Sequence, residues 1–105
     1  MDIEPILQEF KLKTAKLYGA RLKKIVLYGS YARGQANDEH SDIDLAVVLD
    51  DDVNPGKEID RMIDIITDIN LDYDILLSVY PVSENDYHSV NSPLLLNLRK
   101  EGIPV

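Results

Sequence analysis

The sequence predicts a small α/β domain in which a β-sheet is flanked by helices. Segments 2–18 and 56–70 carry apolar residues at helical spacing. Three short runs rich in apolar and β-branched residues are typical of buried strands: 23–28 and 43–49 between these helices, and 71–80 after the second. With 105 residues, 45% of them hydrophobic, the chain is expected to form one domain over residues 1–105.

The amino-acid composition argues against several classes of function. The net charge is −8, which argues against broad nucleic-acid binding. The charge is uneven, because residues 1–34 hold seven of the eleven basic residues and three of the nineteen acids. Cysteine is absent, which excludes disulfides and thiolate metal sites. The acidic start and the lack of a long apolar run predict neither a signal peptide nor a membrane span, so a cytoplasmic protein is expected.

The first helix is expected over residues 2–18. Asp2 is suited to cap it, Pro5 is tolerated in its first turn, and Gly19 is a natural stop. The buried face is predicted from the residues at helical spacing, which are Ile3, Ile6, Leu7, Phe10, Thr14 and Leu17.

A tight turn, Gly29-Ser30, ends the first strand, and a short helical turn is expected over 31–34. Gly29 allows the backbone to approach a ligand closely, and Ser30 and the following amides are candidate phosphate ligands. Arg33 has two possible roles, binding a nucleotide phosphate or pairing with an acid to hold the turn. Residues 29–34 also fit the GxxxxG of a P-loop, but the required Lys and Ser/Thr are missing after Gly34, so that interpretation is rejected.

Two acids stand near the start of the strand over 43–49, after a polar loop over 35–41. Residues i and i+2 of a strand share a face, so Asp42 and Asp44 are expected side by side while Ile43 points into the core. Paired carboxylates repel one another unless a cation joins them, and Mg²⁺ prefers oxygen ligands. His40 could bind a metal or act as a base, but a lone loop histidine is more often exposed.

The remaining segments are an acidic turn, a helix, a third strand and two short helices. Asp50, Asp51 and Asp52 resemble the opening of a calcium loop, but the later ligand positions fail, and Asn54 is instead expected to cap the next helix. That helix has a core stripe of Ile59, Met62, Ile63, Ile66 and Ile69. Asp72 and Asp74 are expected to share one face of the strand over 71–80. Short helices are expected over 84–90 and 93–100.

The turn and the acid pair together resemble a known motif. Gly29-Ser30, eleven further residues and then Asp42-Ile43-Asp44 is similar to the GS…DxD motif of the DNA polymerase beta-like nucleotidyltransferase superfamily. Residues 27–34 and 41–47 resemble its smallest members, the minimal nucleotidyltransferases (MNT). Many of these are the antitoxin half of HEPN/MNT toxin–antitoxin pairs, called MntA beside a HepT toxin. The resemblance implies a polymerase beta-like palm with a small mixed sheet.

The resemblance also implies a site and a reaction. Asp42, Asp44 and Asp74 would be the catalytic acids and would hold two Mg²⁺ ions, the second arriving with the nucleotide, and Asp74 would be the base. Asp72 is the alternative to Asp74. Gly29, Ser30 and Arg33 would bind the nucleotide. ATP would be the donor, and AMP would move to a hydroxyl with release of pyrophosphate.

The partner implied by the resemblance is a HEPN-family toxin, an RNase silenced when AMP is added to one of its tyrosines. Two alternatives stay open. The chain could neutralise such a toxin by contact alone, or it could transfer a nucleotide to a small molecule.

Overall fold

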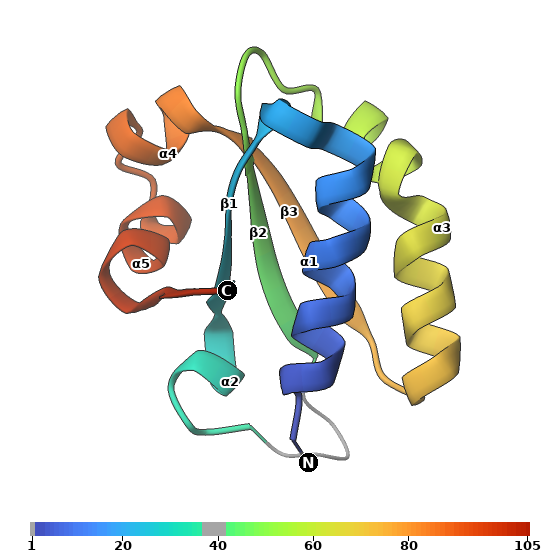
Figure 1. Ribbon diagram of the computed structural model, residues 1–105. Helices are drawn as coiled ribbons and strands as arrows, with labels where there is room; N and C mark the ends of the chain where they lie inside the picture. The colour runs from blue at the N-terminus through green and yellow to red at the C-terminus, as the bar shows by residue number, and fades with distance from the viewer. Residues whose placement is uncertain (1, 37–41) are drawn as a thin grey trace.

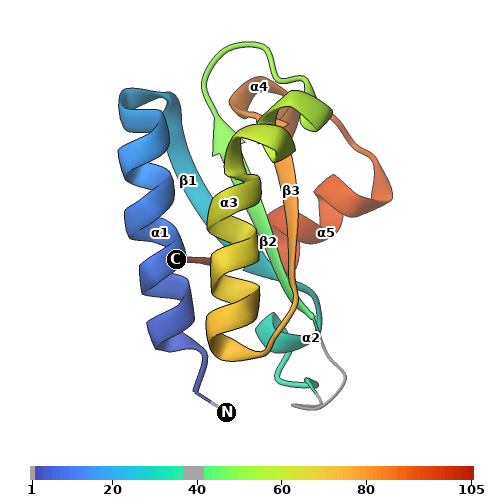
Figure 2. The same ribbon diagram turned by 90° about the vertical axis from the view of Figure 1, so that its right-hand side faces the viewer.

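The computed structural model of the protein describes residues 2–36 and 42–105 (Figure 1). The first half of the chain contains α1 (Glu4–Tyr18), a 3-10 turn η1 (Gly19–Arg21), β1 (Leu22–Tyr28), α2 (Gly29–Ala32) and β2 (Ile43–Leu49). The second half contains α3 (Pro55–Tyr73), β3 (Leu77–Ser83), α4 (Glu84–Ser89), α5 (Pro93–Glu101) and β4 (Ile103–Pro104). Helices α1 and α3 lie on one side of the sheet, and α4 and α5 lie on the other (Figures 1 and 2).

The sheet is mixed, as the sequence predicts. Its strand order is β3-β2-β1-β4, with β2 antiparallel to β1 and parallel to β3. The crossover from β2 to β3 runs through α3, which is the usual way to join parallel neighbours. Strand β4 was not predicted; it contributes two residues, which pair with Val26 and Leu27 of β1.

The two faces of β2 support two separate cores. Its odd-numbered residues, with those of β1 and β3 on the same face, pack against α1 and α3, and Ile43, Leu45 and Val47 are fully buried there. The even-numbered positions Ala46 and Val48 face α4 and α5, where they pack with Tyr87, Leu95 and Leu98. Asp44 continues this second face toward the start of the strand.

Helix α1 has the predicted bounds within two residues, and its buried face differs in one position. The Asp2 carboxylate accepts a hydrogen bond from the Glu4 backbone N–H at 3.0 Å, and Gly19 ends the helix at φ 57°. Tyr18 is buried where Leu17 was expected, because its hydroxyl donates to the Glu58 carboxylate of α3 at 3.1 Å. Leu17 is 44% exposed.

Helix α3 begins as predicted and ends later. The Asn54 side chain accepts a hydrogen bond from the Lys57 N–H, and Pro55 opens the first turn. Met62, Ile66 and Ile69 are buried, whereas Ile63, which was placed on the same stripe, is 46% exposed. The helix continues to Tyr73, whose hydroxyl donates to Glu9 of α1 at 3.1 Å.

The predicted third strand over 71–80 is wrong at its start. Residues 71–73 are the last turn of α3, and β3 covers Leu77–Ser83. Asp74 is therefore not on a strand: it is the C-cap of α3, at φ 51° and ψ 50° in the left-handed region. The Asn70 side chain bridges this connection, accepting a hydrogen bond from the Leu77 N–H at 2.9 Å.

The last two helices start at serine caps. The Ser83 side chain accepts from the Asp86 N–H and the Ser92 side chain from the Leu95 N–H. Both helices match their predicted ranges within one residue. None of the helices in the described ranges is both long and apolar enough to cross a membrane.

Candidate active site

The Gly29 turn lies directly against Asp44. Tyr28 and Asp44 are cross-strand partners in the β1–β2 pair, so the residue after Tyr28 passes beside the Asp44 side chain. Gly29 has φ +73°, and a Cβ built on it would overlap the Asp44 Oδ2 and stand 3.0 Å from its Cγ. Only glycine fits this position, both for its backbone and for its space. The turn after β1 therefore lies directly against the second acid of the pair.

Asp42 and Asp44 form an electrostatically strained pair. Asp44 is half-buried and Asp42 is exposed. Burial raises the pKa of the Asp44 carboxyl, and the neighbouring Asp42 charge raises it further. The positive charge of Arg33 and a hydrogen bond from Ser78 lower the same pKa. A bound cation would relieve this repulsion.

Ser78 is a site neighbour that the sequence did not single out. It is the β3 residue opposite Asp44 in the parallel β2–β3 pair, and its hydroxyl lowers the pKa of the Asp44 carboxyl. Tyr28, Asp44 and Ser78 therefore form one row across three strands. Alternation along the strand places Ser78 on the face of the acids, but its position opposite Asp44 depends on the strand register, which no local pattern specifies.

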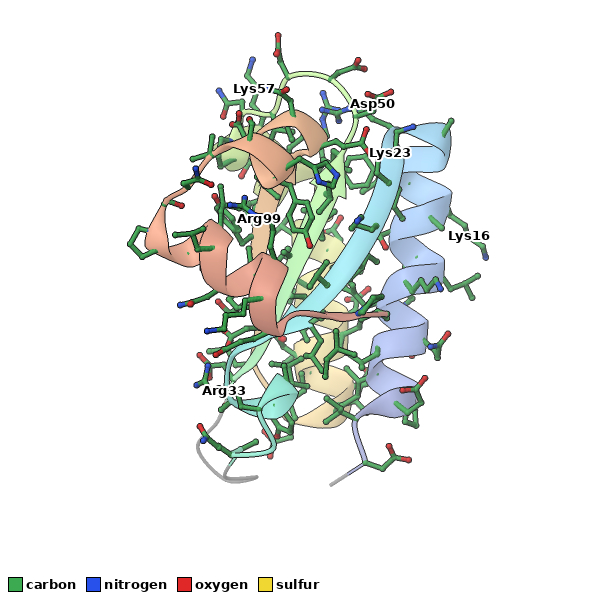
Figure 3. All side chains as sticks on the ribbon, turned by 90° about the vertical axis from the view of Figure 1, so that its left-hand side faces the viewer. Lys16, Lys23, Arg33, Asp50, Lys57 and Arg99 are labelled. Atoms are coloured by element: carbon green, nitrogen blue, oxygen red, sulfur yellow. The ribbon has the colours of Figure 1, made fainter. Side chains whose placement is uncertain are left out.

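Arg33 ties the turn to α5. Its Nη1 lies 3.6 Å from the Glu101 Oε2, and its Nε donates to the Gln35 Oε1 at 3.1 Å. This is the acid-pairing role, one of the two that the sequence allowed. The pair is well exposed and contributes little to stability. Figure 3 shows Arg33 beside α2, at the end of the molecule opposite Lys23 and Asp50.

Asp74 is not brought together with the other two acids. In residues 2–36 and 42–105, no three Asp, Glu, His or Cys side chains are grouped so that they could hold a metal ion. Asp74 is also not among the groups that shift the pKa of Asp44. The fallback residue Asp72 lies in the last turn of α3. The catalytic and metal-binding roles of Asp74 stay predictions.

Two other features do not contribute to the described site. His40 and Ser41 lie outside the described residues. A wide surface hollow lies at the far end of the sheet, lined by the 50–53 loop and by the start of α4. It shares no residue with the row around Asp44.

The donor set around Gly29 fits Mg²⁺ with a nucleotide. Mg²⁺ is commonly held by one or two carboxylates together with phosphate oxygens rather than by a complete protein cage. Asp42 and Asp44 supply two such carboxylates, and the Gly29 turn lies directly against the second of them. The fold and this site together define an α/β domain of the nucleotidyl-transferring class.

Comparison with known proteins identifies the family. The family model described as "Nucleotidyltransferase domain" matches residues 7–92. A Methanocaldococcus jannaschii protein named "Putative protein adenylyltransferase MJ0604" is 35% identical over 103 residues, which are 97% of this chain and 96% of that protein. The chain belongs to the nucleotidyltransferase domain family and is an enzyme of that class.

Solved structures share the fold. The first is described as "Crystal structure of the toxin-antitoxin with AMP-PNP"; it has a TM-score of 0.63 and 20% identity, covering 92% of this chain and 70% of the other. The second is a tri-AMPylated Shewanella oneidensis HEPN toxin in complex with its MNT antitoxin, with a TM-score of 0.53 and 20% identity over 92% of this chain and 69% of the other. At this identity the likeness concerns the fold.

Proposed function

We propose that this protein transfers AMP from ATP to a tyrosine hydroxyl of a HEPN-family toxin in the cytoplasm, in a reaction that requires Mg²⁺. The observation that carries the proposal is the contact of Gly29 with Asp44, because it joins the phosphate-binding turn to the acid pair. The family and the relative named as a protein adenylyltransferase support the reaction. The structural neighbours that contain a HEPN toxin, one of them AMPylated, support the partner.

Each residue of the site has a defined task in this proposal. Asp42 and Asp44 would hold Mg²⁺, with a second ion bound together with the nucleotide. Gly29 lets the turn pass directly against the Asp44 carboxylate, and the Ser30 hydroxyl and the backbone of the turn bind the β- and γ-phosphates. Arg33 leaves Glu101 to bind a phosphate oxygen. When bound, Mg²⁺ neutralises the charge of the triphosphate and of the leaving pyrophosphate.

The transfer is a single displacement at the α-phosphorus. The tyrosine oxygen forms a bond to that phosphorus, the bond from it to the α–β bridging oxygen breaks, and pyrophosphate leaves. The phenolic proton passes from the acceptor oxygen to solvent water. The protein contributes mainly by aligning the acceptor with the phosphate and by stabilising charge.

The direct test replaces the acids without changing their shape. Asp44→Asn and Asp42→Asn/Asp44→Asn are expected to lower the transfer rate about a thousandfold or more, because the oxygen ligands lose their charge. Both variants should fold, since they remove the repulsion that raises the pKa of Asp44. Intact-mass spectrometry of a co-expressed HEPN-family partner reads the added AMP. Undiminished AMP addition by the double variant would refute the proposal.

A second candidate is neutralisation of the partner by contact alone. It is favoured by one observation, that no third acid joins Asp42 and Asp44 among the described residues. The same double Asn variant separates the two functions in a growth assay with the toxin. A contact-only antitoxin keeps its protective effect in this variant, whereas a catalytic one loses it.

Asp74→Gly tests the predicted third acid. Asp74 is exposed and holds the left-handed C-cap of α3, a conformation that glycine adopts without strain. We expect the free energy of unfolding to rise by about 0.5–1 kcal/mol, with no loss of AMP transfer. Urea unfolding and the mass assay measure the two effects.

Asp72→Gly is the matched control, two residues away inside the last turn of the same helix. Glycine there is expected to lower stability by about 1 kcal/mol, the opposite sign. A folded Asp74→Gly protein that no longer transfers AMP would instead establish Asp74 as the third acid, as the sequence predicts.

A further inference from the structure

The start of β3 has an oxygen donor beside the acid pair, and it is not a carboxylate. Ile43 pairs with Leu77 and Asp44 with Ser78, so the register beside the DxD strand is fixed. Ser78 is exposed and lies on the same sheet face as Asp44. Its position is therefore open to anything that binds at Asp44.

No acidic residue of the β3 segment lies at the position beside Asp44. Alternation along the strand puts Leu76, Ser78 and Tyr80 on the face of Asp44. Leu76 is apolar and 53% exposed, and Asp74 belongs to the cap of α3 before the strand begins. Ser78 is thus the first side chain of β3 on this face that offers an oxygen near the acid pair.

The Ser78 hydroxyl can serve two neighbours at once. It has one O–H donor and two acceptor lone pairs. Because Ser78 lies opposite Asp44 in the strand register, its hydroxyl is placed to donate to the Asp44 carboxylate. The lone pairs remain on an exposed atom and are suited to a cation or to a cation-bound water.

We propose that Ser78 is the third polar side chain of the site, a positioning residue that holds Asp44 and presents its own oxygen to the Mg²⁺–nucleotide complex. The inference rests on the proposed function, since it concerns the same site. It differs from that function in assigning the place of a third acid to a serine. Residues that hold a metal-binding carboxylate in this way commonly affect affinity about tenfold or more.

Binding of Mg²⁺ with α,β-methylene-ATP tests this without any turnover, because the α–β bridge of this analogue cannot be cleaved. We expect Ser78→Ala to raise the Kd measured by calorimetry about tenfold. Ser78→Thr, which keeps the hydroxyl, should stay within about threefold of the wild type. Ser89→Ala is the matched control, because Ser89 is exposed on α4 and its hydroxyl donates only to the Asn85 carbonyl at 2.7 Å. That control should bind as the wild type does.

Ser78→Asp is expected to strengthen the response of the protein to Mg²⁺, which a merely structural role of Ser78 would not produce. A third carboxylate beside Asp44 should lower the Tm in the absence of metal through like-charge repulsion and make the rise in Tm on addition of MgCl₂ alone larger than in the wild type. Wild-type affinity in Ser78→Ala, or no added response to Mg²⁺ in Ser78→Asp, would overturn the inference and leave the proposed function standing. Failure of the wild-type protein itself to bind the analogue would overturn both.

Discussion

Gly29→Ala is expected to lower AMP transfer strongly and to destabilise the fold. The added Cβ would overlap the Asp44 Oδ2, and the backbone at φ +73° is strained for any residue with a Cβ. The overlap must be relieved by moving either the turn or the Asp44 carboxylate. We expect a loss of about 3 kcal/mol in the free energy of unfolding and a fall of at least about a hundredfold in transfer. Urea unfolding followed by circular dichroism and the mass assay measure these.

Gly34→Ala is the matched control for that experiment. Gly34 has nearly the same backbone, φ +70°, but nothing lies within 4 Å of the Cβ that would be added. Gly34→Ala should lower the free energy of unfolding by only about 1 kcal/mol, which is the cost of a left-handed backbone for a residue with a Cβ. It should keep its transfer activity. Equal losses in the two variants would show that backbone strain, and not the contact with Asp44, explains the requirement for glycine.

The elements that were predicted correctly have a regular pattern of apolar residues and a residue that marks where the element begins or ends. Strand β2 was predicted with its observed bounds, because Ile43–Leu49 is continuously apolar apart from Asp44. Helix α3 was predicted to begin where Asn54 caps it. Its end was missed because the C-cap is Asp74 rather than glycine, and residues 71–75 alternate in polarity as a strand would.

The same error explains what was missed at the site. Gly29, Asp42 and Asp44 were predicted together because they lie within one motif, and the structure places Gly29 against Asp44. Asp74 was placed on a strand that begins three residues later, at Leu77. The neighbour of Asp44 on β3 depends on strand register, which α3 and the Asn70 bridge set. No local pattern in the sequence specifies that register.

Arg21→Met is expected to destabilise the fold strongly although it lies away from the site. The Glu58 side chain is only 4% exposed, and the Arg21 Nη2 lies 2.6 Å from its Oε2. Removing the guanidinium leaves a buried carboxylate with the Tyr18 hydroxyl and a longer 3.7 Å contact to Arg61. We expect a loss of about 3 kcal/mol in the free energy of unfolding near neutral pH, measured in urea.

Two controls test whether the loss of stability comes from the unpaired buried charge or simply from the loss of an ion pair. Lys13→Met removes the exposed pair with Glu9, which has a similar 3.1 Å separation, and should change stability by no more than about 0.5 kcal/mol. Arg21→Met/Glu58→Leu removes both buried charges and should recover most of the stability lost in Arg21→Met. Failure of the double variant to recover would mean that lost packing of the arginine stem explains the effect.

The pH dependence of the stability of Arg21→Met tests independently whether the charge of Glu58 causes the loss. Hydrogen bonding from Arg21 lowers the pKa of Glu58 in the folded protein, so ionised Glu58 stabilises the wild type at pH values above the unfolded carboxyl pKa of about 4.3. This stabilisation is lost as the pH falls through the lower pKa of the folded state. Without Arg21, burial should raise the pKa of Glu58, and its protonation then relieves the buried charge. The stability difference between variant and wild type should therefore shrink as the pH is lowered from about 7 to about 4.5. A difference that stays constant over this range would show that the charge of Glu58 does not determine the effect.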